Sequence, residues 1–316
     1  MNPYVFLVGC PRSGTTLLHR LTDAHPQLAV IHETLWIPRL FESRKGVTPD
    51  GMVTPELIPH LLADRRFPHL GIEPYELEQL LRSNGRPSYA SFVTAILDLY
   101  GRKRDKPLVG DKSPSYVRSI PTLHALWPAA KFVHLIRDGR DVALSAVAWK
   151  KADKIFRHFR RWSADPWTTA AFWWERSVRL GREAGAKLPR GLYYEVSYEA
   201  LVTDPESECR ELCSFLELRF DEAMLRFHEG RTRPQAGSSK RRWLPPTPNL
   251  RDWRTEMPAD GVERFEAAAG NLLDELGYPR ATPETGPERL DEAAEARQIF
   301  QEDVVERRRP VPERWS

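Results

Sequence analysis

The chain has 316 residues, of which 41% are hydrophobic and 29% charged, and its formal charge is +3 at pH 7. This composition is typical of a globular protein with one large core, or with one core and an inserted lobe. The nearly balanced charge argues against a nucleic-acid-binding protein, which would gather its basic residues on one face.

The cysteines form neither a metal-binding pattern nor a disulfide framework. Cys209 and Cys213 are four residues apart in a predicted helix, and no His or Cys pair near them in the sequence completes a zinc site. The N-terminal segment has no basic region, and its apolar run is too short for a signal peptide or a membrane span. We therefore expect no metal, no membrane span and a cytoplasmic location.

Five short segments rich in Val, Ile, Phe and Tyr are predicted to be strands, and helical patterns lie between them. The strands are expected at residues 4–9, 28–32, 107–110, 131–137 and 191–196. Helices are expected from about residue 15 and at residues 141–151, 167–186, 207–216 and 261–276. This alternation predicts the α/β class, with three layers around a central, mainly five-stranded parallel sheet.

Residues 41–106 fit the alternation poorly. They are rich in Pro, Leu and Arg with scattered helical periodicity, which predicts an inserted helical lobe. Residues 232–251 are polar, basic and proline-bearing, and we expect a mobile surface loop there. Residues 287–308 are expected to form an exposed helix or a partly disordered tail. The predicted organisation is one domain at 1–280 and a charged helix or tail at 281–316.

The stretch VGCPRSGTTLL, residues 8–18, follows the first predicted strand and has the glycine spacing of a phosphate-binding loop. Such a turn aims backbone N–H groups and the positive end of a helix at one anion. Ser13, Thr15 and Thr16 add hydroxyl donors, and Arg12 adds a cation. The lysine of P-loop NTPases is absent after Gly14, which favours a smaller anionic group. The alternative is a glycine-rich turn that binds nothing.

The run GCPRSGTTLL resembles the 5′-phosphosulfate-binding loop of sulfotransferases that use 3′-phosphoadenosine 5′-phosphosulfate (PAPS). The resemblance implies a P-loop-kinase-like fold. It places Arg12 where many members have a Lys or Arg. It aligns Ser13, Gly14, Thr15 and Thr16 with the residues that hold the 5′-phosphate and the sulfuryl oxygens. With the motifs below it extends, in order, over roughly residues 3–278.

The stretch KFVHLIRDGRDVALSAV, residues 131–147, resembles the 3′-phosphate motif of the same family and supplies Arg137 and Ser145. An Arg at the carboxyl edge of a strand can present a planar donor fork to a phosphate, and ligands of open α/β sheets lie beyond these edges. The alternatives are a salt bridge from Arg137 to Asp138 or Asp141, and a Ser145 that bonds back to its own helix.

Two weaker resemblances lie further along the chain. The stretch YYEVSYEALVTDP places Tyr198 where members have a Tyr near the adenosine 3′-phosphate, although it could also be a core tyrosine. The stretch NLRDWRTEMP resembles the C-terminal W-R segment of the family. It makes Arg251, Trp253 and Arg254 possible cofactor-side groups.

Sulfuryl transfer requires that the enzyme position donor and acceptor, stabilise the leaving oxygen and take the acceptor's proton. Cytosolic small-molecule members use a His after the third strand, whereas this chain has LVGDKSPSY there. It looks closer to the tyrosylprotein and bacterial branches. That resemblance makes Glu33 the general base and puts Lys112 at the leaving group, with Arg12 nearby.

Each of these residues has an alternative role. His32 is the rival base, and strand alternation is expected to aim it opposite to Glu33. Glu33 could be a solvated loop residue or a structural partner of Arg12, and Lys112 could be a surface lysine. Asp111, at the end of an apolar strand, is interpreted as structural because no Walker lysine accompanies it.

The sequence therefore predicts a PAPS-dependent sulfotransferase that acts on a hydroxyl acceptor and releases 3′-phosphoadenosine 5′-phosphate (PAP). The acceptor is expected to be a small molecule, carbohydrate or natural product, with steroid, lipid and peptide tyrosine also open. The rivals are a P-loop kinase that uses ATP and Mg²⁺ and a non-catalytic nucleotide-binding homologue. The aromatic-rich residues 149–174 are expected to pack in a core, so the lobe at 41–106 is the better acceptor-site candidate.

Overall fold

The computed structural model describes residues 4–83, 85–229, 244–281 and 284–308. The chain divides into two compact units, here called unit 1 and unit 2. Unit 1 consists of Met1–Ile136 and Leu180–Pro248, and unit 2 of Arg137–Arg179 and Asn249–Ser316. The predicted division at residue 280 concerns the extent of the family domain and stays a prediction.

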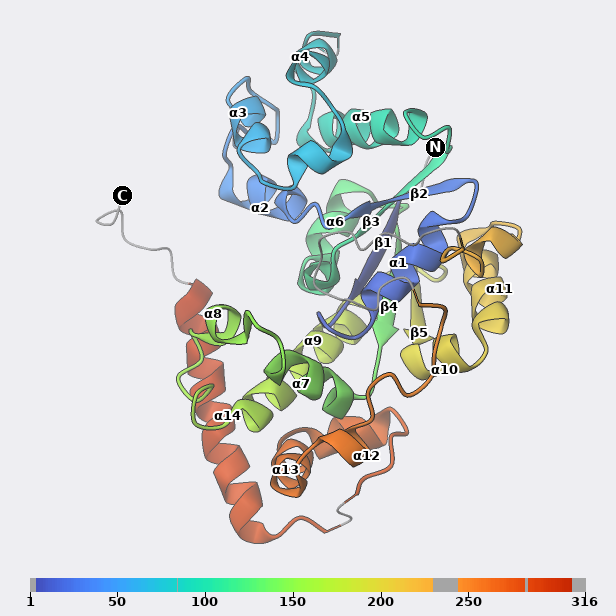
Figure 1. The fold of residues 1–316 in the computed structure, drawn as a ribbon. Coiled ribbons are helices and arrows are strands. Elements are labelled where there is room, and N and C mark those ends of the chain that lie inside the picture. Colours follow the sequence, from blue (N-terminus) through green and yellow to red (C-terminus); the bar gives the residue numbers. More distant parts are fainter. Residues whose placement is uncertain (1–3, 84, 230–243, 282–283, 309–316) are drawn as a thin grey trace. The chain divides into compact units, whose positions relative to one another are not determined.

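Unit 1 holds a sheet of five parallel strands in the order β2-β3-β1-β4-β5 (Figure 1). The strands are β1 (Val5–Gly9), β2 (Leu28–His32), β3 (Leu108–Lys112), β4 (Lys131–Ile136) and β5 (Tyr193–Ser197). The predicted α/β class with a five-stranded parallel sheet is thereby confirmed. β3 runs two residues further than predicted, because the charged Asp111 and Lys112 pair in register with Ile31 and His32 of β2.

Helices cover both faces of this sheet. Alternate residues of β1 enter different cores: Phe6 and Val8 pack in one buried cluster, and Val5 and Leu7 in another. The first cluster takes side chains from α5 (Tyr89–Arg102) and α6 (Ile120–Leu126). The second takes them from α1 (Thr15–Asp23), α10 (Tyr198–Thr203) and α11 (Pro205–Leu216) (Figure 1). Unit 1 therefore has the three layers that the alternation predicted.

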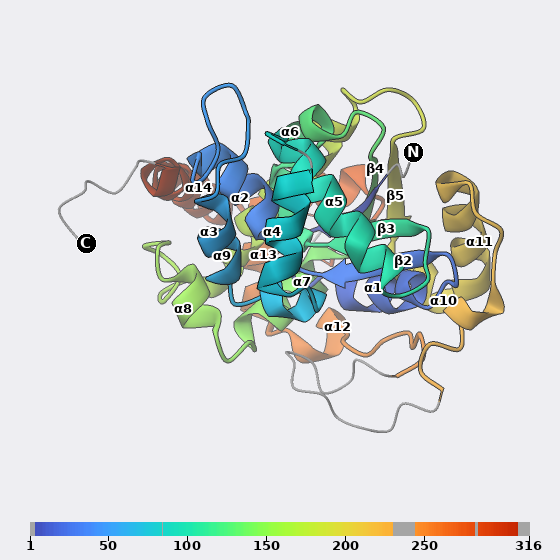
Figure 2. The same ribbon diagram turned by 90° about the horizontal axis from the view of Figure 1, so that it is seen from above.

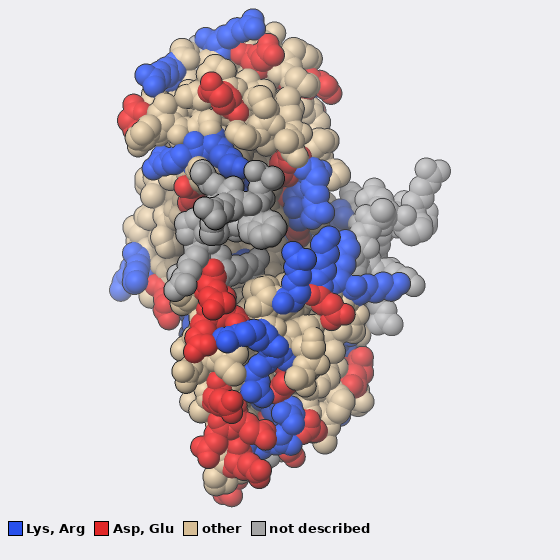
Figure 3. Space-filling view, turned by 90° about the vertical axis from the view of Figure 1, so that its left-hand side faces the viewer, with Lys and Arg blue, Asp and Glu red and all other residues tan. Residues whose placement is uncertain are grey.

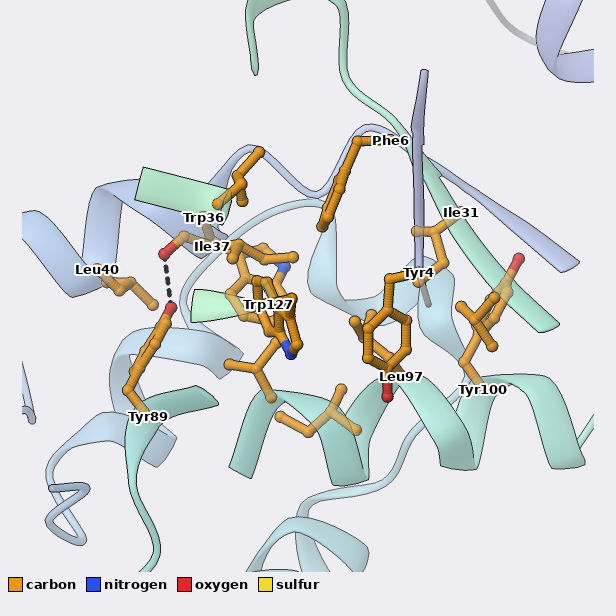
Figure 4. Close-up of a cluster of buried hydrophobic side chains, with 14 of the residues drawn as sticks. Tyr4, Phe6, Ile31, Trp36, Ile37, Leu40, Tyr89, Leu97, Tyr100 and Trp127 are labelled. Carbon is orange, nitrogen blue, oxygen red and sulfur yellow. Dashed lines mark hydrogen bonds between the residues drawn. The ribbon is translucent and has the colours of Figure 1, made fainter. Parts of the chain in front are cut away.

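The segment between β2 and β3 is helical, as predicted for the inserted lobe. Besides α5 it contains α2 (Trp36–Ser43), α3 (Leu57–Leu62), η1 (Phe67–Leu70) and α4 (Pro74–Ser83), and Figure 2 shows α4 beside α5. The hydroxyl of Tyr89 donates to the carbonyl oxygen of Ile37 at 2.7 Å (Figure 4). The rings of Tyr4 and Trp127 meet edge to face at 5.8 Å in the same cluster. The lobe is thus packed into the core that covers one face of the sheet.

The described elements of unit 2 are helices. They are α7 (Gly139–Val147), α8 (Ala152–Phe156), the first part of α9 (Pro166–Gly185), α12 (Trp253–Glu256), α13 (Ala259–Glu275) and α14 (Pro287–Arg308). Phe156 stacks on Trp162 at 4.2 Å, and Phe159 stacks on Phe300 of α14 at 4.6 Å. The aromatic stretch therefore packs in a core, as expected.

The C-terminal helix is more firmly packed than the exposed helix that the sequence suggested. Ala293, Ala296 and Phe300 are buried on one side of α14. Arg160 binds Glu302 and Asp303 at 2.6 Å each. On the face shown in Figure 3, basic and acidic side chains lie interspersed. Residues 309–316 of the predicted tail and 232–243 of the predicted loop lie outside the described residues, and residues 244–251 have no helix or strand.

No metal cluster or membrane-spanning helix is found in the part of the chain that the structure describes. Three grouped His, Cys, Asp or Glu side chains that could hold an ion do not occur there. None of the described helices is both long and apolar enough to cross a membrane. Cys209 and Cys213 are buried free thiols, and the Cys213 sulfur lies 3.5 Å from that of Met224. Burial raises the pKa of Cys209 to about 12, so its thiol is inert.

Candidate active site

The loop between β1 and α1 leaves several backbone donors without a side-chain cap. α1 begins at Thr15, and its N-cap Gly14 has a φ of 96° and makes no side-chain capping bond. The Ser13 amide donates to the Cys10 carbonyl oxygen at 3.1 Å, which closes the turn. The Ser13 hydroxyl is buried and has no hydrogen-bond partner among the described residues. The positive end of a helix and a buried hydroxyl therefore meet in one loop, as an anion site requires.

The two glycines of this loop are required by their surroundings. A Cβ at Gly9 would lie 2.6 Å from the carbonyl oxygen of Leu135, and one at Gly14 would lie 2.5 Å from Cδ2 of Tyr198. Arg12 takes a φ of 78° although it has a side chain. Tyr198, the first residue of α10, is buried against the loop. The structure therefore brings this predicted cofactor residue to the predicted phosphate loop.

A second loop leaves the sheet directly after β2. Glu33 has a φ of 61°, so the chain turns out of the strand at this residue. The Glu33 amide donates to the Lys112 carbonyl oxygen at 2.9 Å, and the Thr34 amide donates to Asp111 Oδ2 at 3.1 Å. The Thr34 and Tyr116 hydroxyls are 2.6 Å apart. Neighbouring β3 and the segment after it thus fix the conformation of this loop.

Lys112 joins the two residues that compete for the role of base. Its Nζ donates to Glu33 Oε1 at 2.8 Å and lies 3.2 Å from His32 Nε2. The Lys112 side chain is only 1% exposed, so its reading as a surface lysine is wrong. Lys112 also pairs in register with Leu7 of β1, two residues before Gly9. This cluster and the phosphate loop therefore leave the same edge of the sheet from adjacent strands.

The prediction that His32 and Glu33 point in opposite directions is wrong. Strict alternation would apply only if Glu33 continued the extended strand, whereas its left-handed φ rotates the side chain back toward Lys112. Arg66, which lies just before η1 in the lobe, approaches Glu33 Oε2 at 3.5 Å. This contact could not be predicted from the sequence, because nothing local links residues 33 positions apart.

The charges around Glu33 keep its carboxylate ionised. Burial acts to raise the pKa of Glu33, but the charge and hydrogen bond of Lys112, with Arg66 further away, outweigh it and lower the pKa. Burial lowers the pKa of Lys112, against the attraction of Glu33. Partial desolvation of the ring, together with the Lys112 charge, lowers the pKa of His32 to about 4, although His32 keeps some exposure to solvent. At neutral pH the cluster thus holds a carboxylate, an ammonium and a neutral imidazole.

Asp111 is the buried support of this loop, in line with its structural interpretation. It is 1% exposed and accepts the Thr34 amide through Oδ2. Burial raises the pKa of Asp111 to about 6, because few donors compensate for its desolvation.

Arg137 and Ser145 belong to unit 2. Arg137 Nη2 donates to Asp141 Oδ2 at 2.9 Å, so the ion pair that was the structural alternative for Arg137 is present. Ser145 lies in α7 and is 6% exposed. The two residues are linked by one short helical segment, and their contact with a phosphate stays a prediction.

A buried network in unit 2 joins Arg140 to Trp253, which the sequence suggested as a cofactor-side group. Arg140 binds Asp138 at 2.7 Å and Glu266 at 2.6 Å, and its guanidinium lies 3.7 Å from the ring centre of Trp253. The Trp253 amide donates to Asp141 Oδ1 at 2.9 Å. Arg254 pairs with Asp252 at 3.5 Å and lies over the same indole. These contacts give Arg140 and Trp253 structural roles, whereas Arg251 and Arg254 stay predictions as cofactor-side groups.

Comparison with known proteins identifies the family. The family model described as "Sulfotransferase family" matches residues 3–222. The chain belongs to the sulfotransferase family. The matched segment includes the phosphate loop, Glu33, Lys112, Arg137 and Tyr198.

The relatives of this sulfotransferase include protein-tyrosine sulfotransferases. Protein-tyrosine sulfotransferase A of Caenorhabditis elegans is 25% identical, over 89% of this chain and 69% of that protein. Protein-tyrosine sulfotransferase 1 of Danio rerio is 27% identical, over 89% of this chain and 74% of that protein. The chain covers 53% of the length of the protein-tyrosine sulfotransferase of Drosophila melanogaster. Among solved structures, the sulfotransferase domain of the Synechococcus olefin synthase is 21% identical, with coverage of 98% of this chain and 96% of that one and a TM-score of 0.48.

Proposed function

We propose that this sulfotransferase transfers the sulfuryl group of PAPS to a hydroxyl acceptor, with Glu33 as the general base. The observation that carries the proposal is the 2.8 Å contact between Lys112 Nζ and Glu33 Oε1, one strand away from the phosphate loop in the sheet. It joins a proton acceptor to a cation on the edge where ligands of parallel sheets bind. Membership of the family supports the reaction type.

In the proposed reaction the acceptor oxygen forms a bond to sulfur while the bond from sulfur to the phosphate oxygen breaks. The acceptor's proton goes to Glu33, which is ionised and able to accept it. Lys112 stabilises the charge that develops on the leaving oxygen of PAP, with Arg12 as a second cation. The reaction needs no metal ion in this scheme.

We assign donor binding to two sets of residues, one for each phosphate end of the donor. Arg12, Ser13, Gly14, Thr15 and Thr16 are proposed to hold the 5′-phosphosulfate through backbone amides, hydroxyls and the guanidinium.

Arg137, Ser145 and Tyr198 are proposed to bind the 3′-phosphate end of the donor. The support is the resemblance of their two sequence segments to the family motifs. For Tyr198 it also includes the packing of its ring on the phosphate loop.

Isothermal titration calorimetry with PAP, with ATP and with ATP plus Mg²⁺ tests donor identity. We expect PAP to bind in the absence of Mg²⁺ and more tightly than ATP. Tight binding of ATP with Mg²⁺ and none of PAP would identify a kinase instead. Transfer from radiolabelled PAPS to a panel of phenols, sugars and tyrosine peptides then tests catalysis. Tight PAP binding without transfer to any of them would identify a non-catalytic homologue.

Transfer to the members of this acceptor panel determines the acceptor class. Protein tyrosine is among its candidates because the curated relatives carry that name. The acceptor-side role of the lobe at residues 41–106 is part of the same proposal, and the contact from Arg66 to Glu33 supports it. The cytoplasmic location stays a prediction.

A further inference from the structure

The buried ammonium of Lys112 has two partners of different chemistry, and only one of them is used in the reaction proposed above. Nζ lies 2.8 Å from Glu33 Oε1 and 3.2 Å from His32 Nε2. An ammonium can only donate, so His32 must accept through an unprotonated Nε2 and carry its proton on Nδ1. His32 and Lys112 also face each other in the register of β2 and β3. The strand pairing therefore builds this contact into the sheet edge.

The surroundings of His32 favour the neutral ring that this contact requires. Lys112 approaches from β3, Glu33 follows in the chain, His19 of α1 contacts the ring, and Arg20 of α1 acts on it through its charge. The rings of His19 and His32 meet edge to face at 5.3 Å. His19 itself is buried with Nε2 against the Val30 carbonyl oxygen at 2.9 Å. A protonated His32 would thus face the charges of Lys112 and Arg20, opposed by the single carboxylate of Glu33.

When Glu33 takes the proton of the acceptor, the attraction between its carboxylate and Lys112 is lost. That loss coincides with the moment at which the lysine must stay charged and in place beside the leaving oxygen. The Lys112 side chain is 1% exposed, so water cannot easily replace Glu33 as its hydrogen-bond partner. A neutral hydrogen-bond acceptor on the protein that takes no part in the proton transfer would keep the Lys112 ammonium oriented throughout the reaction.

We propose that His32 is a positioning residue that holds the Lys112 ammonium through its neutral Nε2 while Glu33 accepts the proton. This inference rests on the proposed function of the same site. It assigns the two neighbouring residues separate roles: Glu33 handles the proton, and His32 orients the lysine. It also explains why a left-handed residue follows β2, since that turn brings both side chains to one Nζ.

The test compares His32→Leu with His32→Gln. The leucine removes the hydrogen-bond acceptor of Lys112, whereas the amide oxygen of the glutamine can still accept a hydrogen bond near the position of Nε2. Transfer from radiolabelled PAPS to para-nitrophenol or a tyrosine peptide is measured across pH. For His32→Leu we expect kcat to fall by about 10- to 100-fold, with KM for PAPS changed less than about threefold. The basic limb of the pH profile should move to lower pH, because the ammonium loses a stabilising partner. His32→Gln should keep most of the wild-type kcat and most of the wild-type position of the basic limb.

His124→Leu in α6, outside the lobe and the loops of the candidate site, is the matched control and should keep the wild-type profile. An unchanged kcat and basic limb in His32→Leu would overturn the inference. A fall in kcat as large as that of Glu33→Gln, with the acidic limb abolished, would also overturn it, since His32 would then be the base.

Histidine ring nitrogen NMR gives an independent readout in the free protein. It should show His32 with Nε2 unprotonated at neutral pH and shifted by Lys112→Met, and protonation on Nε2 instead would contradict the contact. A wild-type protein that neither binds PAP nor transfers sulfate would refute the proposed function, whereas the NMR result would still decide the tautomer of His32.

Discussion

Arg137 Nη2 donates to Asp141 Oδ2 at 2.9 Å, and the other oxygen of the same carboxylate accepts the backbone amide of Trp253. The arginine expected to bind the 3′-phosphate is therefore already held by a carboxylate that a second segment of unit 2 fixes in place. Burial raises the pKa of Asp141 despite this ion pair. A phosphate bound by Arg137 would share its guanidinium with Asp141 or displace it.

Arg137→Ala should weaken PAP binding by about 1.5–3 kcal/mol, the range for a hydrogen bond to a charged group. Calorimetry with PAP measures the loss. Arg160→Ala is a suitable control, because Arg160 also forms ion pairs within unit 2 but with Glu302 and Asp303. We expect its PAP affinity to be unchanged. Equal affinities for all three proteins would mean that the 3′-phosphate binds elsewhere.

Glu33→Gln should lower kcat by about 10²- to 10⁴-fold, the usual contribution of a general base. PAP affinity should stay within a few-fold, because the amide keeps the size of the side chain. Rates from radiolabelled PAPS, with PAP titrations alongside, measure the two effects separately. Glu217→Gln serves as the control, since Glu217 also pairs with a lysine, Lys131 at 2.7 Å, but outside the lobe. A fully active Glu33→Gln enzyme would remove Glu33 as the base.

Gly14→Ala should destabilise the protein more than an ordinary left-handed glycine substitution. Gly14 and Gly51 have φ values of 96° and 84°, but a Cβ at Gly51 meets no atom within 4 Å. We expect Gly51→Ala to cost about 1 kcal/mol from backbone strain alone. Gly14→Ala should cost about 1–3 kcal/mol more, because its Cβ overlaps the Tyr198 ring. Urea unfolding of both variants measures the difference, and equal costs would mean that the ring of Tyr198 does not pack on Gly14.

Asp111→Asn should change how stability depends on pH. The folded pKa of Asp111, about 6, lies above its ordinary value of 3.8. The folded state therefore binds more protons than the unfolded state between these values. The resulting contribution to stability is complete below the lower value and is lost as pH rises through the upper one. From about pH 4 to pH 7 this loss is on the order of 3 kcal/mol.

The variant lacks this titration, so its stability relative to the wild type should rise by that amount over the same interval. Urea unfolding of both proteins at several pH values measures the difference. Parallel curves would show that Asp111 is not the buried acid that the fold suggests.

The strands and the phosphate loop could be predicted because their signals are local. Segments rich in Val, Ile, Phe and Tyr predicted all five strands, and the glycine spacing predicted the turn into α1. The end of β3 was missed because Asp111 and Lys112 look like loop residues. The register with β2 keeps them in the strand, and the Thr34 amide and the Glu33 carboxylate after β2 compensate part of their burial. Such partners are distant in sequence and are known only once the sheet has formed.

The candidate site was predicted in its members but not in its geometry. Glu33 and Lys112 were chosen by resemblance, and the structure joins them. The prediction that His32 points opposite to Glu33 was wrong because alternation assumes an extended backbone. The left-handed backbone of Glu33 cannot be recognised in the sequence. The contact from Arg66 and the network of Arg140 and Trp253 depend on tertiary packing. The division of the chain into two units has the same origin, because each unit combines segments from both halves of the sequence.

Arg12, Glu33 and Leu35 are among the non-glycine residues that hold the left-handed backbone, which glycine adopts at least cost. All three lie in the loops that follow β1 and β2. A library selected only for heat resistance should therefore drift toward Gly or Asn at these positions, gaining a few tenths to about 1 kcal/mol at each. The survivors would be sturdier proteins with no base at position 33, so a screen of this chain for robustness has to score turnover as well.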